Sequence, residues 1–294
     1  MDYLLHIAIL IGIYAILSIS LNLVTGFGGV ISLAHAGFYG IGAYVAAILA
    51  LKGGTPFLLN VLCSGLVAGL LGALISLPAA RVKDDYFVVV TLAFQIIVYG
   101  LMMNCGHLTG GAMGLSGIPA PKIIGLALDS HIAFLMLVIV LVAFAFGVAR
   151  AVVVSPVGRL LRSLREDIAF SHSIGKDVRA CKIQIFAASA GMASMAGVIY
   201  AHYISFIDPT SFTAMESIFI LSIVIIGGAG SLWGPVLGAV VLVLLPELLR
   251  FVGMPSSVAA NVRQILYGAA LVACMIWRPQ GLIGEYSFRK NDTS

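Results

Sequence analysis

The chain has little charge for its length. Only 10% of its 294 residues are charged, whereas 61% are hydrophobic and the mean hydropathy is +1.11. Ordinary soluble domains carry about 25% charged and about 45–50% apolar residues. A soluble core of this size could not bury so much apolar side chain, so most of it must face lipid. We therefore expect an all-α polytopic membrane protein, with no nucleic acid among its partners.

Sequence patterns typical of catalysis or metal binding are also missing. The sequence contains no GxxxxGK[ST] phosphate loop, no HExxH, no GxSxG and no Cys/His ligand cluster. Its four cysteines show no ligand spacing, which indicates small apolar filler rather than disulfides or a zinc site. We therefore expect no enzyme activity, no catalytic residue, no metal and no cofactor in this chain.

Acidic residues are scarce inside the apolar segments. Proton-coupled carriers commonly use chains of intramembrane Asp, Glu or His side chains. Here most acids fall near the predicted ends of segments, and only His35 is expected at depth. The sequence thus indicates a transport path without its own energy source, which favours an energy-supplying partner.

Long apolar runs fill most of the chain. A membrane-spanning helix needs about 20 mostly apolar residues, and about nine segments qualify. They are 3–24, 36–51, 57–78, 86–105, 131–151, 181–200, 214–227, 235–250 and 261–278. No soluble domain or linker separates them, so we expect one transmembrane domain over residues 1–294. Two segments, 36–51 and 214–227, are short and adjoin glycine-rich stretches.

Basic residues lie mainly on one side of the predicted topology. If the basic loop 152–180 is cytoplasmic and the segments alternate, most of the 16 lysines and arginines fall on the cytoplasmic side. Cytoplasmic loops of membrane proteins carry this excess of positive charge. The pattern predicts an N-terminus outside and a C-terminus in the cytoplasm.

Two glycine-rich stretches interrupt the apolar pattern. Residues 25–44 read TGFGGVISLAHAGFYGIGAY, and the GGAGSL of residues 227–232 echoes the GGVISL of residues 28–33. Paired glycine interruptions in two halves point to a transport site, although chance recurrence in a glycine-rich chain explains the echo equally well. We predict a re-entrant break after the first span, and a small-residue face on the helix that follows.

Polar side chains within the spans are the candidates for a translocation path, because such groups face a cavity or the bundle interior. The candidates are Asn22, Ser32, His35, Thr91 and Gln95. The alternative for each is an interhelical hydrogen bond, which contributes about 0.6–2 kcal/mol in membranes.

The one long polar stretch, residues 155–182, predicts an amphipathic helix outside the bilayer. Ser155 is a good N-cap, Pro156 suits the first helical position, and apolar residues then recur at helical spacing. Gly175 is a natural stop, so we expect the helix at about 156–174. This helix either anchors the chain on anionic lipid or fits a groove in a cytoplasmic ATPase.

Six stretches, in order, resemble the LivM-type permeases of the ABC importers for branched-chain amino acids. They are SLNLVTGFGGVISLAHAGFYGIGAY (20–44), DDYFVVVTLAF (84–94), LTGGAMGLSGIP (108–119), GRLLRSLREDIAFSHSIG (158–175), SIVIIGGAGSLWGPVLGAVV (222–241) with PELLR (246–250), and RPQGLIG (278–284). The resemblance covers roughly residues 18–284.

This resemblance implies a permease that moves branched-chain or other hydrophobic amino acids into the cytoplasm across a bacterial inner membrane. It also implies the partners: a second related permease, two ATP-binding subunits that hold ATP and Mg, and a periplasmic substrate-binding protein. The 156–174 helix then becomes a coupling helix. Its candidate ATPase-coupling residues are Arg159, Arg162, Arg165, Glu166, Asp167, Ala169 and Gly175. Phe170 and His172 depart from the small residues that the family usually has there.

Several interpretations stay open at this point. Related permeases carry urea, short amides or other amino acids. A self-sufficient channel or secondary carrier would purify as a homo-oligomer, and a membrane-embedded enzyme would need a catalytic constellation that the sequence lacks. Glu216, predicted by the outer mouth, either helps to dock the binding protein or is a solvated end charge. The loop 108–121, predicted outside, is either part of an outer gate or a passive connector.

Overall fold

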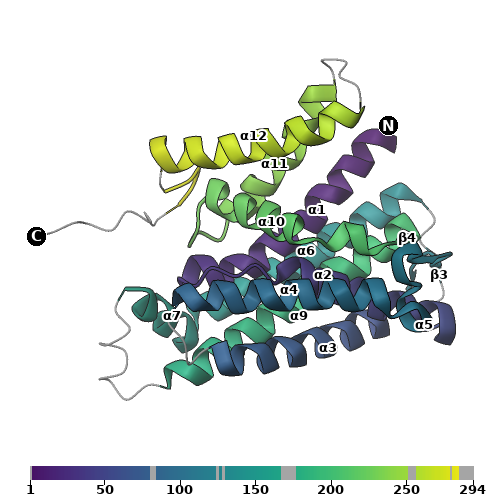
Figure 1. The fold of residues 1–294 in the computed structure, drawn as a ribbon, viewed down its shortest axis with the longest axis horizontal. Coiled ribbons are helices and arrows are strands. Elements are labelled where there is room, and N and C mark those ends of the chain that lie inside the picture. The colour runs from purple at the N-terminus through teal and green to yellow at the C-terminus, as the bar shows by residue number, and fades with distance from the viewer. Residues whose placement is uncertain are drawn as a thin grey trace, which may run out of the picture.

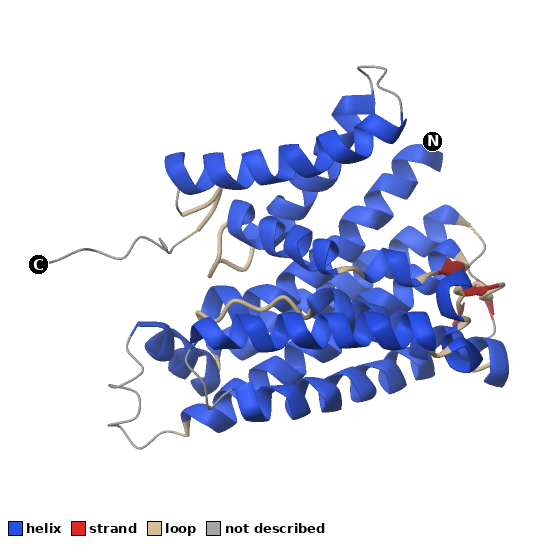
Figure 2. Ribbon diagram, in the orientation of Figure 1, coloured by secondary structure: helices blue, strands red, loops and turns tan. Residues whose placement is uncertain are grey.

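The structure is a computed structural model that describes residues 2–79, 84–123, 126–127, 130–166, 177–250, 256–278 and 280–284. Helices make up most of these residues, as Figure 2 shows, with a few short strands at one end. The prediction of a helical polytopic membrane protein is confirmed.

Each of the nine predicted apolar segments is a helix. Among the described residues, six of these helices are long and apolar enough to cross a membrane, and the other three contain shorter apolar stretches of 10–17 residues. The six are α1 (Asp2–Asn22), α2 (His35–Gly53), α3 (Phe57–Ala79), α4 (Asp84–Asn104), α6 (His131–Val154) and α9 (Val178–Ile204). The other three are α10 (Ala214–Gly227), α11 (Gly234–Arg250) and α12 (Ser256–Trp277).

Three of the long helices form the centre of the bundle. In its most apolar window, α1 has 78% of its residues buried, whereas α3 and α6 have only 22%. On α3 the outward side chains repeat every fourth residue, and all are more than half exposed. They are Leu58, Leu62, Leu66, Leu70 and Leu74. Such a leucine stripe is what lipid requires, so α3 lies at the periphery and α1, α2 and α9 lie inside.

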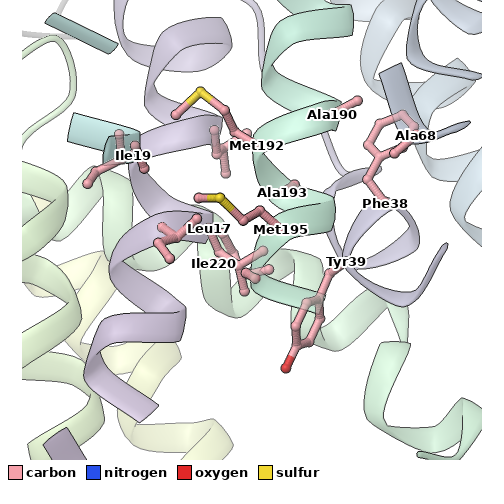
Figure 3. Close-up of a cluster of buried hydrophobic side chains, with 14 of the residues drawn as sticks. Leu17, Ile19, Phe38, Tyr39, Ala68, Ala190, Met192, Ala193, Met195 and Ile220 are labelled. Atoms are coloured by element: carbon pink, nitrogen blue, oxygen red, sulfur yellow. The ribbon is translucent and has the colours of Figure 1, made fainter. Parts of the chain in front are cut away.

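The central helices approach closely because small residues line their contact. Figure 3 shows the buried cluster here, with Leu17 of α1, Phe38 of α2 and Ala193 of α9. A Cβ atom on Gly42 would lie 2.1 Å from the carbonyl oxygen of Ser194, and one on Gly197 would lie 2.0 Å from that of Tyr39. The small-residue face predicted on α2 is therefore confirmed at its contact with α9.

The two ends of the bundle carry different elements (Figure 1). At one end lie β1 (Leu115–Ser116), which pairs antiparallel with β4 (Phe206–Ile207), and the hairpin of β2 (Lys122–Ile123) and β3 (Leu126–Ala127). Two short helical pieces complete this end, namely α5 (Gly106–Thr109) and η2 (Gly111–Met113), while η3 (Pro209–Phe212) leads from β4 into the bundle. The sequence did not predict these strands, because two-residue strands carry no periodic signal.

The opposite end carries the amphipathic helix α7 (Pro156–Glu166). It begins where the sequence predicted, and Ser155 Oγ accepts a hydrogen bond from the Gly158 N–H at 3.4 Å. The remainder of the predicted 156–174 helix lies outside the described residues.

Candidate functional site

A break in the helical backbone follows α1. The chain passes into a π-helix, η1 (Leu23–Phe27), and then runs without regular structure to His35. Gly29 has a φ of 71°, a conformation that favours glycine. π-helical turns within helices are frequent at functional sites. The re-entrant break predicted after the first span is thus present, and we call residues 23–34 the first break.

A second break separates α10 from α11. Gly228 and Gly230 have φ values of 116° and 83°, and α11 starts at Gly234. The chain segment after α12 returns to this point, since the N–H of Leu282 donates to the Ile226 carbonyl at 2.9 Å and that of Ile283 to the Gly227 carbonyl at 3.0 Å. We call residues 228–233 the second break.

Asn22 joins the two breaks directly. Its Nδ2 donates to the Ser231 carbonyl at 2.8 Å, and its Oδ1 accepts from the Gly230 N–H at 3.0 Å. The side chain is 2% exposed. The two glycine stretches that echo one another in the sequence are therefore neighbours in space.

Ser32 lies near the end of the first break and His35 begins α2, and both are fully buried. His35 Nε2 lies 2.9 Å from Ser189 Oγ, and that hydroxyl donates to the Ser20 carbonyl at 2.6 Å. Ser32 Oγ accepts only a long local bond from the Ala34 N–H, at 3.4 Å. The His35 and Ser189 contacts tie the start of α2 to α9 and α1.

Thr91 and Gln95 of α4 form hydrogen bonds to the backbone of the first break and of η3. Thr91 Oγ1 accepts from the Leu33 N–H at 3.1 Å, and Gln95 Nε2 donates to the Phe212 carbonyl at 2.8 Å. Both are fully buried. Three of the five path candidates, Asn22, His35 and Thr91, bond backbone or helices around the breaks, while Gln95 bonds η3 and Ser32 is bonded locally. Contact with cargo stays a prediction for all five.

The α7 helix packs on the first break. Leu161 and Leu164 are buried, as the predicted apolar face requires. Arg165 Nη1 donates to the Gly26 carbonyl, and the Arg162 guanidinium lies 5.8 Å from the centre of the Phe27 ring. A Cβ on Gly230 would lie 2.8 Å from Arg165 Nη1, so this guanidinium reaches both breaks.

The other coupling candidates are distributed differently. Arg159 is exposed, and its guanidinium reaches back to the Val154 carbonyl at 3.5 Å. Glu166 is the last residue of α7 in the structure. Asp167, Ala169 and Gly175 lie outside the described residues. The assignment of an ATPase-coupling role to these residues stays a prediction.

Glu216 does not stand at the outer end, where the sequence placed it. Its Oε1 accepts a hydrogen bond from Tyr14 Oη at 2.6 Å, and Tyr14 lies near the middle of the span Asp2–Phe27. The carboxyl is therefore at about half depth in the bundle. Its role in docking a binding protein stays untested.

Two hydroxyl groups that matter for this geometry were missed by the sequence reasoning. Ser217 Oγ accepts the Ala36 N–H at 3.0 Å and so caps the start of α2, while Ser189 holds His35. Both are polar residues within apolar spans, which is the signal that selected Thr91. A cavity of about 190 Å³ lies elsewhere, beside His131, His202 and Tyr203.

Comparison with known proteins gives a consistent result. The family model described as the permease component of branched-chain amino acid transport systems matches residues 3–275. The high-affinity branched-chain amino acid transport system permease protein LivM of Escherichia coli K12 is 36% identical over 94% of this chain and 69% of its own length.

More distant relatives match too. The permease protein LivH of the same-named system in E. coli K12 is 24% identical over 94% of this chain and 93% of its own. The autoinducer 2 import system permease protein LsrC of E. coli is 26% identical over 74% and 60%, respectively. No solved structure matches the chain significantly.

Proposed function

The chain belongs to the family of branched-chain amino acid transport permeases, and from this premise we propose that it is one permease subunit of an ABC importer. In this role it moves branched-chain or other hydrophobic amino acids into the cytoplasm. It is a multi-pass membrane permease, and we propose a bacterial inner membrane as its location, with α7 facing the cytoplasm and the N-terminus outside.

The observation that supports this proposal most is the chain of contacts from α7 to both breaks. Arg165 of α7 holds the Gly26 carbonyl in the first break and lies against Gly230 in the second. Asn22 then links the same two segments. A displacement of α7 by a partner therefore acts on backbone inside the bundle, because packed elements shift as discrete units rather than deform smoothly.

We propose the following partners. Two ATP-binding subunits, which hold ATP and Mg, contact the exposed side of α7 around Arg159. A periplasmic substrate-binding protein delivers cargo to the end that carries the β1–β4 pair. E. coli has two different permeases of the same-named system, both similar to this chain, which supports a second, non-identical permease as the other half of the path.

The cargo could also be a different small solute within the same family. LsrC, a relative named for autoinducer 2 import, shows that names in this group are not restricted to amino acids. Ligand binding by the cognate substrate-binding protein decides between an amino acid and another cargo such as urea or a short amide.

A charge reversal in α7 tests the coupling. Arg165→Glu replaces the donor to the Gly26 carbonyl by an acceptor, so we expect uptake by the reconstituted transporter to fall at least about tenfold. Cargo-stimulated ATP hydrolysis should fall with it, while membrane insertion stays normal. The control is Lys52→Glu, which reverses an exposed charge in the last turn of α2, the end of that helix away from the first break. Unchanged uptake by the Arg165→Glu transporter would contradict a role of α7 in coupling.

A further inference from the structure

Glu216 is a carboxyl group in the interior of a membrane bundle. Although it lies in the first turn of α10, that helix starts deep, because the preceding η3 descends until the Phe212 carbonyl meets Gln95 near the middle of α4. Ionisable groups at such depth are rare, and they mark substrate paths or relays.

The surroundings of this carboxyl are tyrosines from three helices. Tyr14 of α1 donates to Glu216 Oε1 at 2.6 Å. The rings of Tyr39 of α2 and Tyr200 of α9 lie 5.5 Å apart, and both pack on the ring of Phe212, four residues before Glu216, at 4.9 and 6.0 Å. Figure 3 shows the Tyr39 hydroxyl directed away from the apolar cluster.

The carboxyl of Glu216 is not paired with a cationic side chain of the described residues. Within the part of the chain that the structure describes, no Lys, Arg or His side chain forms an ion pair with Glu216, whose one side-chain hydrogen bond there comes from Tyr14. A second acceptor, on α4, has no donor in the described part of the chain. Gln95 Oε1 is buried without a hydrogen-bond partner, on the amide group that holds Phe212, and the Phe212 ring packs 4.9 Å from that of Tyr39.

Glu216 and two of the tyrosines are accessible at the surface of this chain. Glu216, Tyr14 and Tyr200 are each partly exposed. A charged carboxyl facing lipid at this depth costs several kcal/mol, so this face of the bundle fits a polar path better than the bilayer.

We propose that Glu216, framed by Tyr14, Tyr39 and Tyr200, receives the ammonium group of the cargo during translocation. A primary ammonium offers three N–H donors and a positive charge, which match the carboxylate, the tyrosine hydroxyls and the aromatic ring faces. This inference rests on the proposed function, because it requires that the cargo is an amino acid or another primary amine.

The test uses the complete transporter in proteoliposomes and measures initial uptake of radiolabelled leucine against the concentration of loaded binding protein. Glu216→Gln keeps the volume and an acceptor for Tyr14 but removes the charge. We expect the maximal rate to fall at least about tenfold with an unchanged half-saturating concentration. Glu216→Asp should retain more activity, and Tyr14→Phe should lose about two- to fivefold.

The chain contains a matched control. Tyr3 donates to Glu247 in a second tyrosine–glutamate pair, which joins α1 to α11. Glu247→Gln should therefore transport at the wild-type rate.

Three outcomes overturn the inference while the wild-type protein transports leucine. The first is a rate of Glu216→Gln equal to that of Glu247→Gln. The second is a change in the half-saturating concentration alone, which assigns Glu216 to docking the binding protein. The third is loss of the second permease on purification, which assigns Glu216 to an ion pair across that interface. A wild-type transporter that does not take up amino acids refutes the proposed function instead.

Discussion

Asn22 is the residue whose place in the structure says most about the breaks. Asn22 is the last residue of α1, and its side-chain amide forms two hydrogen bonds with the second break. It accepts one from the Gly230 N–H and donates one to the Ser231 carbonyl. Composition made it a candidate because polar residues in spans are few. Its partners, Gly230 and Ser231, lie about 208 residues further along the chain, so local sequence patterns carry no information about the contact.

Replacement of Asn22 by leucine should destabilise the protein. Asn22→Leu leaves the Gly230 N–H and the Ser231 carbonyl buried without partners, and each unsatisfied group costs about 1–3 kcal/mol. We expect the free energy of unfolding in mixed detergent micelles, followed by circular dichroism, to fall by about 2 kcal/mol or more.

Asn104→Leu is the matched control for this change. Asn104 is exposed, and its Nδ2 bonds the Gly100 carbonyl of its own helix at 2.7 Å. We expect a change within about 0.5 kcal/mol. Equal losses in the two variants would contradict the structural role of Asn22.

At the scale of elements, the contact between α2 and α9 depends on glycine. Gly42→Ala and Gly197→Ala each place a methyl group about 2 Å from a carbonyl oxygen of the other helix, so the helices must separate. Overpacking of this kind typically costs about 1–3 kcal/mol. Thermal unfolding of the purified variants should show a lower midpoint than the wild-type protein.

Gly100→Ala separates this packing effect from the general effect of removing a glycine. Gly100 lies inside α4, and no atom would come within 4 Å of a Cβ there. Alanine is the better helix former by about 1 kcal/mol, so this variant should be as stable as the wild-type protein or more so. Destabilisation by Gly100→Ala to the same extent would refute the account of the α2–α9 contact.

The sequence predicted the helices well and their interruptions only in outline. Apolar runs, most of them close to the 20 residues that a bilayer requires, located the nine apolar helices. The capping residues Ser155 and Pro156 fixed the start of α7. The descent of η3 to Gln95 and the π-helical turn at Leu23–Phe27 could not be predicted, because both depend on contacts with distant helices.

For the whole molecule, the arrangement predicts which side faces the cytoplasm. Figure 1 places α7 at one end of the bundle and the β1–β4 pair at the other. With α7 on the cytoplasmic side, a single cysteine introduced at Met113, which is 87% exposed, should react with an impermeant thiol reagent added to intact spheroplasts. Labelling only after the membrane is opened would show the opposite orientation, with α7 outside. The four native cysteines are first replaced by serine.

We expect the chain to transport solute only when its partner subunits are present. A self-sufficient channel or carrier would move solute when the chain is reconstituted alone, whereas a permease subunit requires ATP-binding subunits, a second permease and the loaded binding protein. In the described part of the chain, α7 contacts both breaks, so a partner that displaces α7 can change the conformation of the bundle.

The most direct test is ATP-dependent accumulation of leucine in proteoliposomes that contain this chain with and without its proposed partners. The account predicts accumulation against a gradient only when all partners and ATP are present. Leucine entry into vesicles that contain this chain alone, without ATP, would contradict it.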